Sequence, residues 1–276
     1  MKLIGITLAI GMLAALVAAC GGGDDSASTP ANTRSPEPDS VGTPGAAGDE
    51  LACADPQGET EQIDSTKLIF EYNSTDVDTG VHGLFDTTGW SELCVYDPDG
   101  RQVLAVKPQG RLKDLTMGGI FFESREPPDT EMSQEEILAN FPEGSYEVRA
   151  TSFEGKGLTG TATLTHDIPQ APTITSPTEG AVVDSANLVV SWEPVTQTVN
   201  GGPVTITGYE VIVTKETEDD PHGFSLPVLS AHVLPSVTSL TVPTEFLEAG
   251  TEYELEVLAL EESGNQTITV IFFETQ

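Results

Sequence analysis

The 276-residue chain contains few basic residues, with 11 Lys and Arg against 44 Asp and Glu, for a formal net charge of −33. Phosphate binding requires clustered Lys and Arg, so this composition argues against nucleic acid as a partner. Long apolar runs are also missing: after the first twenty residues none approaches the length of a membrane-spanning helix. The excess of acidic side chains favours solubility and attracts divalent cations or basic partners.

The motifs of the common enzyme classes are missing as well. The sequence has no Gly-x-Ser-x-Gly elbow, no His-Glu-x-x-His pair and no phosphate-binding glycine loop. Its four histidines have no partner at ligand spacing. We therefore expect a protein that is not an enzyme and has no resident cofactor except, as one alternative, Ca²⁺. A hydrolase with a site assembled in three dimensions from residues 51–167 stays open, because catalytic triads are recognised by geometry.

The first nineteen residues have the pattern of an export signal. Lys2 is followed by an almost wholly apolar stretch from Leu3 to Val17, too short for a comfortable membrane helix. It ends in Val17-Ala18-Ala19-Cys20, which resembles the lipobox of bacterial lipoproteins. The resemblance implies cleavage before Cys20, acyl chains such as palmitate on its thiol and a place in the cell envelope. The residue after the cysteine is Gly21 and not Asp. In a Gram-negative host the resemblance therefore implies that the protein is sorted to the outer membrane.

Residues 20–50 are predicted to form the lipidated cysteine and a disordered linker. The segment after Cys20 has no aromatic residue and one large aliphatic residue, Val41. Such a composition cannot bury enough apolar surface to become ordered. We interpret this segment as a stalk between the lipid and the folded part of the chain.

Two further cysteines, Cys53 and Cys94, form an even pair in what would be an oxidising compartment. A disulfide between them is the prediction, and two reduced thiols are the alternative. Structural zinc is disfavoured at either cysteine because neither has a Cys-x₂-Cys partner.

Residues 171–276 show strand patterns separated by turns, about seven in a hundred residues, which is typical of a β-sandwich. Trp192 lies in the second strand, and Ile206-Thr-Gly-Tyr209 opens the third. Leu247-Glu-Ala-Gly-Thr-Glu-Tyr253 leads into the sixth. These motifs resemble those of a fibronectin type III domain, with Ala249 where proline is usual. The resemblance implies core positions for Trp192 and Tyr209, a tyrosine corner at Tyr253, and no catalytic residues.

Residues 51–167 also have the pattern of a sandwich. Strands are predicted at 67–72, 81–85, 92–96, 101–106, 119–122, 145–152 and 158–165. A short helix near 133–140 is predicted from a capping box formed by Ser133 and Glu136. Tyr146 follows Phe141-Pro-Glu-Gly144 much as Tyr253 follows its own glycine turn. This echo favours an immunoglobulin-like sandwich with a second tyrosine corner.

Polar residues gather in one segment of this first domain. Asn73, Asp76, Asp78 and Asp86 offer side-chain oxygens, and Ca²⁺ takes six to eight of these. A calcium site is therefore one hypothesis, and a polar turn that satisfies its own backbone is the other. Trp90 and Phe85 are similarly interpreted as core, with an exposed aromatic platform for a ligand as the alternative.

Together these patterns predict an all-β chain of two tandem β-sandwiches, immunoglobulin-like and then fibronectin type III, after a signal peptide and a disordered linker. The expected function is a non-enzymatic envelope lipoprotein, held at a membrane by its lipid anchor. It would display the two modules for binding or structural roles. The alternative is a calcium- or glycan-binding module that uses the 73–86 loop. Besides the membrane, the expected partner of the modules is a protein or a glycan ligand.

Overall fold

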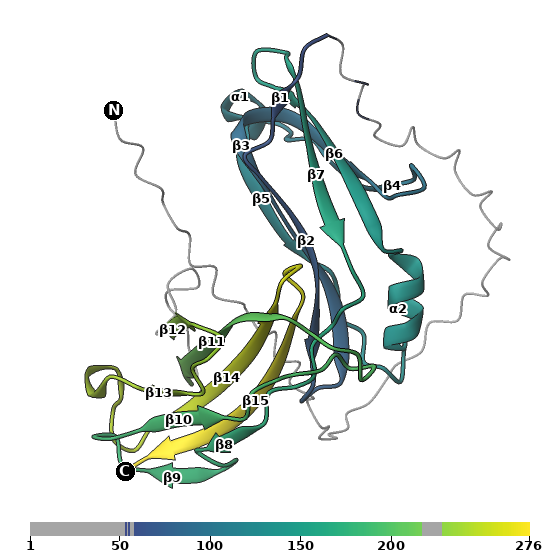
Figure 1. The fold of residues 1–276 in the computed structure, drawn as a ribbon. Coiled ribbons are helices and arrows are strands. Elements are labelled where there is room, and N and C mark those ends of the chain that lie inside the picture. Colours follow the sequence, from purple (N-terminus) through teal and green to yellow (C-terminus); the bar gives the residue numbers. More distant parts are fainter. Residues whose placement is uncertain (1–52, 54, 56–57, 217–227) are drawn as a thin grey trace, which may run out of the picture. The chain divides into compact units, whose positions relative to one another are not determined.

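The computed structural model of the chain describes residues 53, 55, 58–216 and 228–276, and these are mostly β-sheet (Figure 1). The predicted signal peptide, the lipidation site Cys20 and the linker to residue 50 lie outside the described residues. Two separate clusters of buried hydrophobic residues form the cores, one within 63–168 and one within 188–273. The predicted all-β architecture of tandem sandwiches is confirmed.

The first domain is built from strands β1 to β7 and helices α1 and α2. Their bounds are β1 (Glu61–Gln62), β2 (Ser65–Asn73), β3 (Asp78–Tyr96), β4 (Gln102–Val106), α1 (Leu112–Leu115), β5 (Met117–Glu123), α2 (Gln134–Asn140), β6 (Gly144–Ser152) and β7 (Gly157–Leu164).

Strand β3 belongs to both sheets of this sandwich. The sequence predicts two separate strands at 81–85 and 92–96, but the structure has one continuous strand of 19 residues. Its first part, up to Asp86, pairs with β2 and β5, and its second part, from Trp90, pairs mainly with β6 and β4. The register shifts between these parts, and such irregularities let a strand bend from one sheet into the other.

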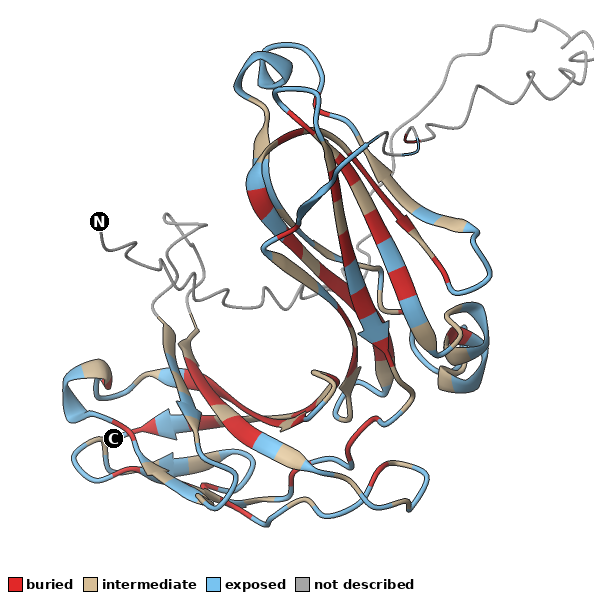
Figure 2. Cartoon of the chain, turned by 45° about the horizontal axis from the view of Figure 1, so that its top comes forward, coloured by how far each residue is buried: buried red, intermediate tan, exposed pale blue. Residues whose placement is uncertain are grey.

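Burial alternates from residue to residue along the strands that cover the core of the first domain. Along β6 the side chains of Tyr146, Val148 and Ala150 are buried, while the residues between them are more exposed (Figure 2). Phe85 and Trp90 are fully buried. The indole N–H of Trp90 donates to the carbonyl of Gly118 at 3.1 Å. The alternative of an exposed aromatic platform at these two residues is therefore wrong.

Helix α2 begins after Ser133, whose hydroxyl accepts a hydrogen bond from the backbone N–H of Glu136. The Glu136 carboxylate in turn accepts from the backbone N–H of Ser133 at 2.9 Å, which completes the capping box. The helix ends at Asn140, two residues before Pro142. No helix in the described part of the chain is long and apolar enough to cross a membrane.

The second domain is built from eight described strands. Their bounds are β8 (Ile174–Ser176), β9 (Ala181–Val183), β10 (Val189–Trp192), β11 (Ile206–Lys215), β12 (Val228–Val233), β13 (Ser239–Thr241), β14 (Glu252–Glu261) and β15 (Gln266–Thr275). One sheet has the order β13-β10-β8, and the other contains β9, β15, β14, β11 and β12.

Aromatic side chains fill the space between the two sheets of this domain. The ring centroids of Trp192 and Tyr209 lie 5.4 Å apart, and those of Tyr253 and Phe273 also lie 5.4 Å apart. All four side chains are at most 3% exposed. Together with the buried aliphatic residues around them, they form the apolar core of this domain.

Each domain has a tyrosine whose hydroxyl forms a hydrogen bond with the backbone a few residues earlier in the chain. Tyr146 donates to the carbonyl of Pro142 at 2.9 Å. The hydroxyl of Tyr253 accepts from the backbone N–H of Glu248 at 2.8 Å and donates to the carbonyl of Phe246. Both rings are fully buried, so each residue combines an apolar body with a satisfied polar tip, as in a tyrosine corner.

Residues Ala52–Gln276 cluster as one unit, in which β15 pairs in parallel with β2. In this register Gln266 lies opposite Glu71, and Ile268 lies opposite Asn73. The backbone N–H of Ser74 extends the contact by donating to the carbonyl of Ile268 at 2.9 Å. Backbone hydrogen bonds therefore join the last strand of the chain to the first long strand.

Candidate functional site

The turn between β2 and β3 contains three of the four residues of the predicted calcium site. Asn73 ends β2, Asp78 begins β3 and Asp76 lies between them. The side-chain carbonyl of Asn73 accepts from the backbone N–H groups of Thr75 and Asp76, and its amide donates to the Asp76 carboxylate at 3.0 Å. The polar groups of Asn73 are thus engaged in stabilising the turn itself.

Asp86, the fourth predicted ligand, lies elsewhere. It pairs with Ser65 at one end of the β2–β3 ladder, whereas Asn73 pairs with Asp78 at the other end. Eight residues of strand separate the two ends, a distance of about 26 Å at the usual rise. The structure therefore brings Asn73, Asp76 and Asp78 together and leaves Asp86 apart.

Asp78 has an unusual environment for an aspartate at a turn. Burial raises the pKa of its carboxyl group to about 6, with further contributions from the negative charges of Glu126 and Asp76. Its Oδ1 atom is buried without a hydrogen-bond partner among the described residues. The carboxyl group of Asp78 therefore takes up a proton at a higher pH than an ordinary aspartate does.

A second cluster, which the sequence analysis did not identify, consists of Glu71, His82 and Glu126. One potential ligand atom from each side chain lies within 4.8 Å of those from the other two. The ladder pairs Ile69 with His82 and Glu71 with Gly80, so Glu71 and His82 are diagonal neighbours on one face of the sheet. Glu126 approaches from the segment after β5, and its Oε1 lies 3.0 Å from Nε2 of His82.

Burial dominates the electrostatics of this cluster. Glu71 is 4% exposed and His82 is 2% exposed. Burial raises the pKa of Glu71 well above its ordinary value, although a hydrogen bond from the amide of Gln266 opposes this shift. The pKa of the neighbouring Glu123 is also raised by burial, and the nearby imidazole of His82 partly opposes that rise. The carboxyl groups of Glu71 and Glu123 are therefore poorly solvated.

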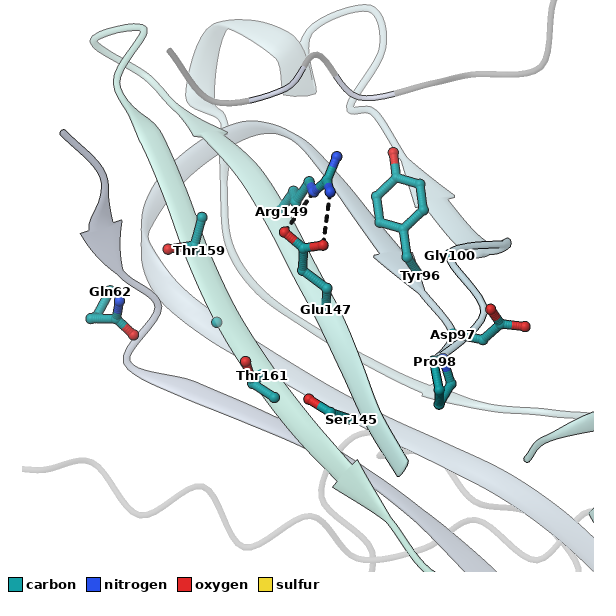
Figure 3. Close-up of a pocket in the computed structure, with 11 residues that line it drawn as sticks. Gln62, Tyr96, Asp97, Pro98, Gly100, Ser145, Glu147, Arg149, Thr159 and Thr161 are labelled. Carbon is teal, nitrogen blue, oxygen red and sulfur yellow. Dashed lines mark hydrogen bonds and ion pairs between the residues drawn. The ribbon is translucent and has the colours of Figure 1, made fainter. Parts of the chain in front are cut away.

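The first domain also carries an open polar groove with a volume of about 640 Å³, along the first half of β6 and the middle of β7 (Figure 3). Arg149 lines this groove, and its guanidinium lies 4.8 Å from the centroid of the Tyr96 ring. The same guanidinium forms a two-pronged ion pair with Glu147 and contacts Asp55. Its charge is therefore already balanced, and its stacking covers the only aromatic ring that lines the groove.

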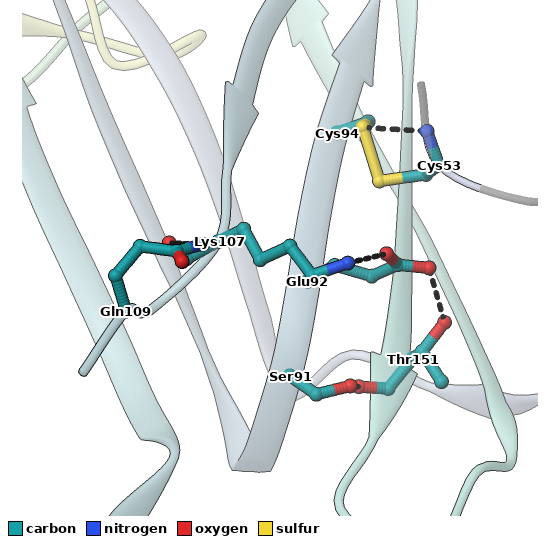
Figure 4. A network of polar contacts seen from close by, with 7 residues as sticks. All are labelled: Cys53, Ser91, Glu92, Cys94, Lys107, Gln109 and Thr151. Carbon is teal, nitrogen blue, oxygen red and sulfur yellow. Dashed lines mark hydrogen bonds and ion pairs between the residues drawn. A yellow bond between two sulfur atoms is a disulfide. The ribbon is translucent and has the colours of Figure 1, made fainter. Parts of the chain in front are cut away.

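The predicted disulfide between Cys53 and Cys94 is confirmed, and it joins the segment before β1 to the buried part of β3 (Figure 4). Beside it, the Glu92 carboxylate accepts from Thr151 at 3.0 Å and pairs with Lys107 at 3.5 Å. This network links β3 to the neighbouring strands β6 and β4 and serves the fold.

The fold and these sites define a pair of β-sandwich modules without an obvious catalytic constellation in the described residues. Residues 175–273 match the family model described as Fibronectin type III domain, and the C-terminal domain is accordingly a fibronectin type III domain. Trp192, Tyr209 and Tyr253, on which the resemblance depends, all lie inside the matched range. No curated protein matches the chain.

Two solved structures are similar to the chain. The crystal structure of chicken CNTN1 FN1-FN3 domains is 13% identical with a TM-score of 0.31, and the match covers 78% of this chain and 65% of that one. The solution structure of the third fibronectin III domain of the human KIAA0343 protein is 22% identical with a TM-score of 0.29, covering 40% of this chain and 85% of that one. The chain thus covers about two thirds of the length of the chicken structure.

Proposed function

We propose that the protein is a non-enzymatic lipoprotein of the bacterial cell envelope. A lipid on Cys20 would hold two β-sandwich modules at a membrane surface, where they serve in binding or in envelope architecture. The observation that carries this proposal is the sequence Val17-Ala18-Ala19-Cys20 at the end of the apolar stretch from Leu3. A single acyl chain binds a membrane only marginally, so a lipoprotein of this kind would rely on two or three chains.

The pairing of the cysteines supports this proposal. Cys53 and Cys94 are bonded to each other, which leaves Cys20 as the one cysteine of the sequence available for acylation. Structural disulfides persist in oxidising compartments such as the periplasm or the cell surface. Export followed by lipidation accounts for both the bonded pair and the third cysteine.

The contacts of the described histidines support a non-catalytic role. Nε2 of His166 contacts the backbone carbonyl of Phe141, and His82 and His232 contact carboxylates. None of these three is hydrogen-bonded through its ring to a serine hydroxyl or a cysteine thiol, as the base of a nucleophilic triad would be. These contacts support binding or structural roles for the two modules.

The test compares the full-length chain with its Cys20→Ser variant in a bacterial host. We expect the wild type in the membrane fraction, with acyl chains on its N-terminal peptide by mass spectrometry. The serine variant should lose both the acylation and the membrane association. A Ser26→Ala variant, which leaves the lipobox intact, is the control and should behave as wild type. Tight membrane association of the unacylated Cys20→Ser protein would contradict the proposal.

A further inference from the structure

We propose that Glu71, His82 and Glu126 form a binding site for one zinc ion in the first sandwich. Two carboxylates and one imidazole are a donor set that zinc accepts, with a fourth position for water. The three residues come from β2, β3 and the segment that follows β5, so the ion would tie three parts of one domain together. The site is separate from the predicted calcium turn and does not depend on the lipid anchor.

Glu126 contacts Nε2 of His82 directly at 3.0 Å, whereas the spacing between Glu71 and Nδ1 of His82 leaves room for an ion. Nδ1 of His82 lies 4.0 Å from Oε2 of Glu71, which is too far for a hydrogen bond. Zinc bonds to nitrogen and to carboxylate oxygen at about 2.0–2.2 Å each, so two ligands of a tetrahedral zinc ion lie about 3.4 Å apart. The 4.0 Å gap between Glu71 and His82 is slightly wider than this, and a small movement of the two side chains would close it onto the ion.

Unsatisfied polarity is the independent observation that indicates a ligand. Nδ1 of His82 is buried and has no hydrogen-bond partner among the described residues, although buried polar atoms are nearly always satisfied. This nitrogen lies on the side of the Glu71 carboxylate, and the His82 side chain is only 2% exposed. A lone pair left this way costs free energy unless something binds it.

The balance of charge also favours a cation. No Lys or Arg in the described ranges forms an ion pair with Glu71 or Glu126, and the only basic group beside them is the His82 imidazole. Burying carboxylates without a counter-charge is costly, so such groups are usually paired or bind metals. A divalent ion would supply the missing positive charge.

The donor set favours zinc over calcium. Calcium takes six to eight oxygen ligands, and this cluster offers an imidazole nitrogen and two carboxylates. Imidazole suits zinc and the neighbouring transition metals, and zinc needs only four ligands. The acidity of the chain would not by itself distinguish the two ions.

The surroundings of the cluster are adapted to hold its ligands. The side-chain amide of Gln266 donates to the Glu71 carboxylate, which fixes the orientation of that ligand as an outer-shell partner would. Gly80 has no side chain, and a Cβ atom at this position would collide with the carboxylate of Glu126. Glu126 is 22% exposed, which leaves a path to the solvent for the ion.

The experiment measures zinc binding by the full-length protein, purified without a polyhistidine tag and stripped with a chelator. We expect one zinc ion per chain after equilibrium dialysis against ZnCl₂, measured by elemental analysis. Thermal unfolding should shift upward with zinc, because the ion binds the folded state. Calcium chloride at the same concentration should neither shift the unfolding nor displace the zinc.

Two variants locate the site. Glu126→Gln removes one ligand at a partly exposed position, and we expect it to weaken zinc binding by about 100-fold or more, beyond the effect typical of an outer-shell partner. Gly80→Ala keeps every ligand atom but displaces the Glu126 carboxylate, and we expect about 10-fold weaker binding. His232→Gln is the matched control, because it removes an exposed histidine that also pairs with a glutamate, and it should bind zinc as wild type does.

Absence of stoichiometric zinc in the wild type would overturn the proposal. So would zinc binding that survives both Glu126→Gln and Gly80→Ala unchanged. X-ray absorption at the zinc edge of the wild-type protein gives a second measurement that does not depend on how well the variants fold. It should show a shell of nitrogen and oxygen only, and sulfur ligands or an all-oxygen shell would contradict the assignment.

Discussion

The side-chain carbonyl of Asn265 accepts a hydrogen bond from the backbone N–H of Phe70 at 2.8 Å, although the two residues are 195 positions apart in the chain. The amide of Asn265 donates to both the backbone carbonyl and the hydroxyl of Thr165, at 3.0 Å each. Asn265 is 1% exposed. One buried side chain therefore connects the turn before β15 with β2 and with the end of the first domain.

We expect Asn265→Ala to lower the free energy of unfolding by about 2–3 kcal/mol, because it leaves the buried N–H of Phe70 without an acceptor. Chemical denaturation followed by circular dichroism measures the change. Asn187→Ala, at an exposed position, is the control and should stay within about 0.5 kcal/mol of wild type. A change of that small size for Asn265→Ala would show that water replaces the lost contacts.

Glu256 on β14 makes stability depend on pH. Burial, together with the neighbouring carboxyl group of Glu254, raises the pKa of Glu256 from 4.5 to about 8. Between these values the folded protein keeps a proton that the unfolded chain has released, so the free energy of unfolding falls as the pH rises. The slope from one such group approaches about 1.4 kcal/mol per pH unit. This contribution is complete below the lower pKa and is lost as the pH passes the upper one.

We therefore expect Glu256→Gln to be more stable than wild type at about pH 8.5 and to match it near pH 4.5, because glutamine stays neutral throughout. Urea unfolding across this range measures the difference. Glu252→Gln, at an exposed position on the same strand, should keep the wild-type pH dependence. If the wild type and Glu256→Gln show parallel profiles, Glu256 does not hold its proton in the folded protein.

The Cys53–Cys94 bond closes a loop with a sequence separation of 41 residues. In the chain-entropy model a loop of this size stabilises the folded state by about 4 kcal/mol. We expect the double variant Cys53→Ser, Cys94→Ser to lose about this much, as measured by denaturant unfolding. Reductant should destabilise the wild type by a similar amount and leave the double variant unchanged. A wild type insensitive to reductant under unfolding conditions would argue against the bond.

Local patterns were enough to predict most elements of the fold. The capping box at Ser133 and Glu136 determines a helix from neighbouring residues alone, and α2 begins where it predicts. The motifs around Trp192 and Tyr253 identify the second domain, because core aromatics and a glycine turn at set spacing occur together in that family. The break between two predicted strands inside β3 was wrong, because pairing with strands of both sheets keeps the chain extended through 86–90.

The candidate sites depended on contacts that no local pattern contains. The sequence alone predicted a lipobox that ends at Cys20, an acidic chain of tandem sandwiches after it, and a disulfide between Cys53 and Cys94. Only the tertiary structure separated Asp86 from Asn73 and brought Glu126 to His82. The physical reason is that a turn or a cap is set by interactions over a few residues. A buried cluster is set by strand register and by irregular segments, which the whole fold determines.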